Sequence, residues 1–81
     1  MIYPVQIRAA RGLLGMGQEE LANLALISVI TLKRFEAAGT EIRGAASTHL
    51  RLQRALEAAG IIFIDQDGSQ GPGVRLRDPL P

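Results

Sequence analysis

The most constraining feature of this sequence is a stretch without any charged residue, LANLALISVITL at residues 21–32. It is too short to cross a bilayer, which takes about 20 apolar residues, so it is either a buried strand or two short helices. Ser28 is the only good helix N-cap inside it, and Thr31 follows three residues later. The stretch therefore predicts two short helices that meet at Leu26 and Ile27, with the second beginning after Ser28.

The flanking residues extend this pattern into a helical domain. Pro4 suits a first helical turn, and the apolar spacing that follows it predicts a helix ending near residue 14 or 15. A second helix should begin at Gln18, where two acidic residues favour the positive end of its dipole. In the third helix Leu32 and Phe35 should point inward, and Gly39 should end it. After a connecting loop at residues 40–45, a fourth helix should run from Ser47 to about residue 59, with Ser47 as its cap.

The hydrophobic period changes from 3.6 to 2 after Gly60. The runs IIFID and VRLR flank QDGSQGPG, which is rich in turn residues. We therefore expect a β-hairpin at residues 61–77, and a disordered tail at residues 78–81.

Composition limits the possible functions. The 81 residues suffice for one small domain, and the absence of cysteine excludes disulfides and thiolate metal sites. His49 alone cannot hold a metal. The net charge of +1 provides no nucleic-acid footprint unless Arg and Lys cluster locally. The sequence shows no signal-peptide pattern and no membrane span, so we expect a cytoplasmic protein without a membrane partner.

Residues 18–37 resemble the helix-turn-helix of the Cro/cI-like (XRE-family) transcriptional regulators. The shared pattern is a glutamine at the start of the first helix of the motif, which is the second helix expected in this chain (Gln18). A small residue follows four positions later (Ala22), and apolar positions are spaced through both helices of the motif. With its flanks, the resemblance covers roughly residues 5–62. It implies a mainly α fold, a compact four- to five-helix Cro/cI-like domain, with residues 1–60 as the DNA-binding part. The hairpin at residues 61–77 is then a candidate dimer contact, by strand pairing or by face packing.

The resemblance also implies the site. In that family the glutamine corresponding to Gln18 fixes the domain on a phosphate, and the following helix enters the major groove. Lys33 or Arg34 is expected to contact a phosphate, and Arg34 can reach a guanine. Thr31 suits a phosphate or a base edge. The implied DNA-binding residues are Gln18, Ser28, Val29, Ile30, Thr31, Lys33 and Arg34.

Alternatives remain open at several positions. Lys33 and Arg34 are also what an ordinary solvated helix carries, and Arg8 and Arg11 suit either a solvated face or a phosphate-facing patch. The family usually has glycine where this chain has Leu26. A left-handed conformation there costs a non-glycine residue roughly 1–2 kcal/mol, so either the turn differs or the strain is tolerated.

Enzyme chemistry has no support in the sequence. DQDG departs from a calcium loop, because its glycine comes two positions early and Leu76 stands where a glutamate is needed. GLLGMG has the wrong spacing for a dinucleotide loop, and no base accompanies the serines. We therefore expect no catalytic site, cofactor or metal.

The sequence predicts a sequence-specific DNA-binding regulator, expected to be a repressor, that binds an inverted-repeat operator in double-stranded DNA as a homodimer. The alternative is a helix-turn-helix fold used as a protein-interaction module. Such a module would sequester a transcriptional activator or another regulator through an apolar face formed by Val29 and Ile30.

Overall fold

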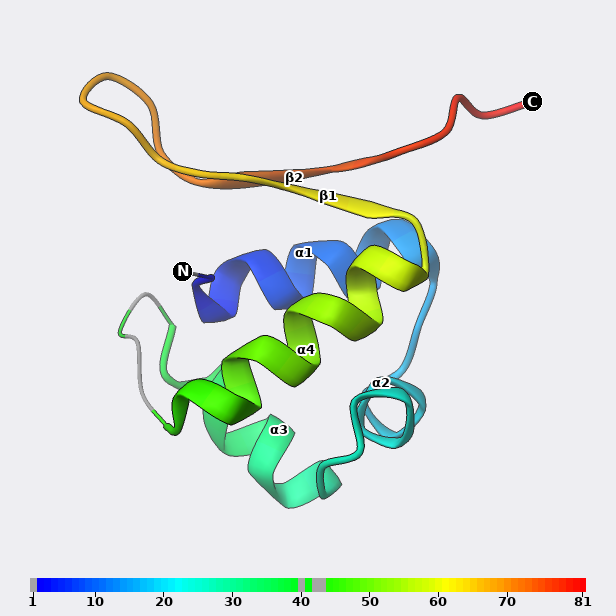
Figure 1. Ribbon diagram of the computed structural model, residues 1–81, viewed down its shortest axis with the longest axis vertical. Coiled ribbons are helices and arrows are strands. Elements are labelled where there is room, and N and C mark those ends of the chain that lie inside the picture. The colour runs from blue at the N-terminus through cyan, green and yellow to red at the C-terminus, as the bar shows by residue number, and fades with distance from the viewer. Residues whose placement is uncertain (1, 40, 42–43) are drawn as a thin grey trace.

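The computed structural model describes residues 2–39, 41 and 44–81, and Figure 1 shows its chain. Within them, four helices precede a two-stranded antiparallel hairpin, which confirms the mainly helical class with a small C-terminal hairpin. Of the predicted loop at residues 40–45, residues 40, 42 and 43 lie outside the described residues. The elements are α1 (Pro4–Leu14), α2 (Gln18–Ala25), α3 (Val29–Ala37), α4 (Ala46–Ala58), β1 (Ile61–Ile64) and β2 (Gly73–Leu76).

The core forms where the four helices meet. Leu21, Leu32 and Leu52 are fully buried, each contributed by a different helix, and Ile7 of α1 joins them. Burying one such side chain contributes roughly 1.5–3 kcal/mol, so these positions fix how the helices pack. The uncharged stretch is therefore two short helices whose inward faces share one core. Among the described residues, no helix has both the length and the apolar character that crossing a bilayer requires.

The hairpin lies over α1 and α4, at the opposite end of the molecule from α3 (Figure 1). Its strands pair in the register Ile61 to Leu76 and Phe63 to Val74, and these four side chains pack on the core. The alternate residues of β1, Ile62 and Ile64, are exposed. The alternation of β1 therefore places one apolar face on the helices and a second one in solvent.

A buried glutamine holds the hairpin to α1. The side chain of Gln6 is 2% exposed, and its Oε1 accepts a hydrogen bond from the Tyr3 amide at 2.8 Å. Its Nε2 donates to the backbone oxygens of Ile64 at 3.2 Å and Gly73 at 3.0 Å. All of these polar atoms are thus satisfied, as a buried amide requires. The same side chain closes the first turn of α1 and fastens the hairpin.

The turns after α1 and α2 have the same geometry. Gly15 ends α1 at φ 63, and Leu26 ends α2 at φ 58 and ψ 43, both left-handed. In each turn the next amide reaches back five residues, from Met16 to the Arg11 oxygen at 2.9 Å and from Ile27 to the Ala22 oxygen at 3.0 Å. The turn is therefore not reshaped around Leu26, and the strain of a left-handed leucine is tolerated.

The fourth helix begins earlier than predicted, and its N-cap lies two residues before Ser47. Helix α4 begins at Ala46, with Ala45 in the N-cap position and no side-chain cap. Ser47 lies inside the first turn, so it is not the cap. Alanine is the best helix former, which explains why the helix extends back past Ser47 to Ala46.

Candidate nucleic-acid interface

Helix α3 is held at its start by Ser28. The Ser28 Oγ accepts a hydrogen bond from the Thr31 amide at 3.0 Å and donates one to the Thr31 Oγ1 at 2.9 Å. The predicted cap is thereby confirmed. Both hydroxyls take part in the cap, so Ser28 and Thr31 fix the position of the first turn of α3.

The exposed face of α3 carries one large apolar residue and two cations. Ile30 is 60% exposed, and Lys33 and Arg34 are exposed three and four positions later, hence on the same helix face. Val29 does not belong to this face, because it is half-buried and packs against the core. We call Ile30, Lys33 and Arg34 the α3 stripe.

A polar hollow of about 470 Å³ lies along one side of the α3 stripe, between α1, α2 and α3. It brings Gln18 and Lys33 together with two arginines of α1. Its lining residues are Arg8, Arg11, Gln18, Lys33, Glu36 and Ala37.

An ion pair forms the inner wall of this hollow. Arg11 donates from Nε to Glu36 Oε2 at 2.8 Å and from Nη2 to Glu36 Oε1 at 2.7 Å, a two-pronged contact. Its Nη1 donates to the Met16 oxygen at 3.2 Å. The hydrogen bonds with Glu36 raise the pKa of Arg11 above its ordinary value. The two arginines, which the sequence could not distinguish, therefore differ. Arg11 has a structural role, and exposed Arg8 supplies positive charge to the hollow together with Lys33.

Gln18 joins the same network. Its Nε2 donates to Glu36 Oε1 at 3.0 Å, while its backbone begins α2. The first helical hydrogen bond of α2 runs from the Leu21 amide to the Gly17 oxygen at 3.1 Å. The earlier amides of α2 need partners from outside the helix, as at any helix N-terminus. Gln18 therefore lies at the N-terminus of α2, with its side chain oriented by a buried carboxylate.

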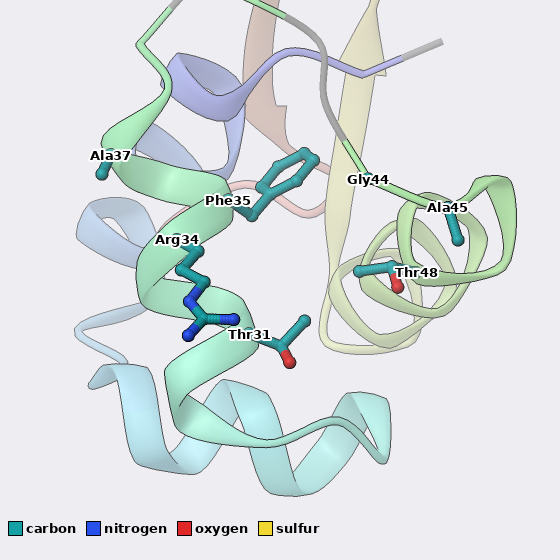
Figure 2. Close-up of a pocket in the computed structure, with 7 residues that line it drawn as sticks. All are labelled: Thr31, Arg34, Phe35, Ala37, Gly44, Ala45 and Thr48. Carbon is teal, nitrogen blue, oxygen red and sulfur yellow. The ribbon is translucent and has the colours of Figure 1, made fainter.

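On its other side the α3 stripe borders an apolar hollow of about 490 Å³, between α3 and the start of α4. Figure 2 shows that Thr31 and Phe35 lie toward Thr48 and Ala45. Arg34 lies at the edge of this apolar hollow. Phe35 also packs edge-on against His49, with ring centroids 4.8 Å apart. The two cations of the stripe thus border different hollows: Lys33 lines the polar one and Arg34 the apolar one.

The sequence-based set of seven residues is brought close together, but its members have unequal roles. Ile30, Lys33 and Arg34 project from the protein, and Gln18 lines the polar hollow together with Lys33. Ser28, Val29 and Thr31 instead cap α3 or pack under it.

Glu36 was missed, although the sequence carried a signal for it. It lies four positions after Leu32, so it shares the buried side of α3 and is only 4% exposed. An acidic residue on that side of a helix needs a buried partner. The partner could not be identified from the sequence, because Arg11 is 25 residues away.

No protein-family model matches the sequence, and no curated protein matches it either. Among the residues that the structure describes, no group of three or more His, Asp or Glu side chains is placed to hold a metal ion.

Proposed function

We propose that this protein is a sequence-specific DNA-binding regulator of the Cro/cI-like helix-turn-helix type. The observation that carries the proposal is the α3 stripe, in which Ile30, Lys33 and Arg34 project together from a short helix. This helix follows α2 after only three residues. A helix of this diameter fits the major groove of B-DNA, so its exposed face can meet base edges.

The charge around α3 also supports DNA. The net charge of the chain is only +1, yet Glu36 neutralises Arg11 and leaves Arg8, Lys33 and Arg34 around the helix. Such cations bind the phosphate backbone without sequence preference, and contacts to base edges add specificity. The amides at the start of α2 provide further donors for a phosphate beside Gln18.

The position of the hairpin favours one way of forming a homodimer. The hairpin and α3 lie at opposite ends of the protein (Figure 1). Pairing of strand edges around a two-fold axis perpendicular to the sheet keeps both α3 helices on one side. Packing of two sheet faces through Ile62 and Ile64 would turn the helices to opposite sides. An inverted repeat needs both helices on one face of DNA, so the proposed dimer uses strand pairing.

This dimer would act as a repressor in the cytoplasm. A bound dimer covers an operator of about two half-sites, one helical turn apart, and excludes other proteins from that DNA.

The test starts from a pool of random duplexes, because the operator must be found first. The purified full chain is used to select duplexes, and binding to the selected duplex is compared with an unrelated one by fluorescence anisotropy. We expect a preference of about 10³-fold or more. Lys33→Ala and Arg34→Ala should each weaken binding, whereas Arg54→Ala, which removes an exposed charge from α4, should not. Equal binding to both duplexes would refute the proposal.

A second function is supported by the exposure of two apolar residues, one in the turn before α3 and one in its first turn. Leu26 is 78% exposed and Ile30 60%, four positions apart across the turn, which suits a protein-docking face better than the Val29 and Ile30 pair expected from the sequence. Such a module would sequester a transcriptional activator or another regulator. In that case Ile30→Asp abolishes capture of the partner, and Lys33→Ala and Arg34→Ala leave it unchanged.

A further inference from the structure

We propose that Ile30 determines operator sequence by contacting the 5-methyl group of a thymine in the major groove. This inference rests on the proposed DNA-binding function. It specifies which base is selected by the residue in the first turn of α3.

Of the three residues at the start of α3, Val29, Ile30 and Thr31, Ile30 is the one that is free to reach a base. It is the second residue of α3, in the turn that enters the groove most deeply. Val29 before it packs against the core, and Thr31 after it is bonded to Ser28 through both its amide and its hydroxyl. Ile30 is 60% exposed and has no such constraint.

The chemistry of Ile30 selects a thymine. An isoleucine side chain has no hydrogen-bond donor or acceptor, so it cannot satisfy the polar edges of guanine, adenine or cytosine. The only apolar group that a standard base pair presents in the major groove is the 5-methyl of thymine. Contact with that methyl removes apolar surface of both partners from water.

The surroundings of Ile30 suit DNA as the occupant. Lys33 and Arg34 lie one turn further along the same exposed face, and Glu36, the acidic residue of α3, is buried and paired with Arg11. A partner that covers Ile30 also meets these two cations, so a negatively charged partner is favoured. Duplex DNA meets both demands, with a methyl in the groove and phosphates along its edge.

The helix also holds Ile30 firmly. Leu32 is fully buried and Phe35 is 4% exposed, so α3 is anchored from below. A β-branched side chain in a helix has essentially one χ1 rotamer, so little side-chain freedom is lost when DNA binds. The methyl contact is thus preorganised.

The experiment replaces thymine by uracil, which removes the methyl and keeps every hydrogen-bonding group. Each thymine of the selected operator is replaced one at a time, first in one half-site and then in the other. Binding of the full chain to each duplex is measured by anisotropy. We expect one thymine position per half-site at which uracil weakens binding by about fourfold, the effect of one buried methyl.

Variants assign that effect to Ile30. Ile30→Ala should bind the thymine and uracil operators equally, and Ile30→Val should keep most of the discrimination. Lys33→Ala is the matched control, since it should weaken binding to both operators and still prefer thymine. Circular dichroism checks that each variant is folded.

Three results are informative. If the wild-type chain binds its operator specifically but tolerates uracil at every position, this inference fails and the proposed function stands. If Ile30→Ala still prefers thymine, another residue makes the contact and the inference again fails alone. If no duplex is preferred over another, both the proposed function and this inference are refuted.

Discussion

Replacing Leu26 by glycine should relieve strain that the fold now tolerates. Leu26 ends α2 at φ 58, where a side chain costs roughly 1–2 kcal/mol and glycine costs nothing. Two losses oppose this gain. Glycine makes the unfolded chain more flexible, by about 0.4–1 kcal/mol. The contacts of a side chain that is 78% exposed are worth about a fifth of full burial, or roughly 0.3–0.6 kcal/mol.

The clean measurement compares Leu26→Gly with Leu26→Ala. Both lose the same side-chain contacts, but alanine keeps the left-handed strain. We therefore expect the glycine variant to be more stable by about 1 kcal/mol, which corresponds to roughly 4–8 °C in Tm for a domain of this size. Thermal unfolding followed by circular dichroism, together with urea unfolding, gives both numbers.

The turn after α1 supplies a reciprocal control. Gly15 has φ 63, and an added Cβ would meet no atom within 4 Å. Gly15→Ala should therefore destabilise by about 1 kcal/mol through backbone strain alone. Gly12→Ala, inside α1 and equally free of contacts, should stabilise by about the same amount, because alanine favours the helix. If Leu26→Ala equals Leu26→Gly in stability while Gly15→Ala is destabilised, the reasoning about Leu26 is wrong.

Two further outcomes follow from charged groups. Glu36→Gln should lower the free energy of unfolding in urea by about 3 kcal/mol, because it leaves the Arg11 cation without its partner carboxylate. The double variant Glu36→Leu with Arg11→Met should recover most of this loss. A double variant no more stable than Glu36→Gln would contradict this reasoning. Hydrogen bonds from the amides of Ser69 and Gln70 lower the pKa of Asp67. The loop contacts of this carboxylate should therefore be complete at pH values above its ordinary pKa, and should be lost as the pH falls through the lowered pKa. Amide NMR shifts of Ser69 and Gln70 should thus titrate below pH 3.9 or so, and should not do so in Asp67→Asn.

Much of the fold followed from local patterns in the sequence. Leu52 and Leu56 lie one turn apart, and both are fully buried. Ser28 caps α3 because its hydroxyl oxygen accepts a hydrogen bond from an amide that has no carbonyl partner within the helix. The hairpin followed from the change of period after Gly60. Each of these signals depends on residues close in sequence, which is why the sequence was sufficient.

The features that sequence reasoning missed depend on distant residues or on small energy differences. Gln6 meets the hairpin 58 and 67 positions away, and no local pattern indicates such a partner. The conformation of Leu26 was left open, since a cost of roughly 1–2 kcal/mol is small against the burial of the core beneath it. The sequence placed Val29 and Ile30 on one exposed face of α3, but only burial separates Ile30, which projects, from Val29, which packs inward.

The salt dependence of DNA binding should report how many protomers bind. Three exposed cations of α1 and α3 are expected to meet phosphates, namely Arg8, Lys33 and Arg34, whereas Arg51 donates to the Leu26 oxygen at 2.9 Å. If each neutralises one phosphate, the slope of log K against log salt is about −3 for one protomer and about −5 for a dimer on two half-sites. Between 50 and 200 mM salt, affinity should then fall by about 40-fold for a monomer and by about 10³-fold for a dimer. Lys33→Ala should reduce the dimer slope by about two units, one for each copy. A slope near zero would exclude the phosphate contacts on which the charge argument depends.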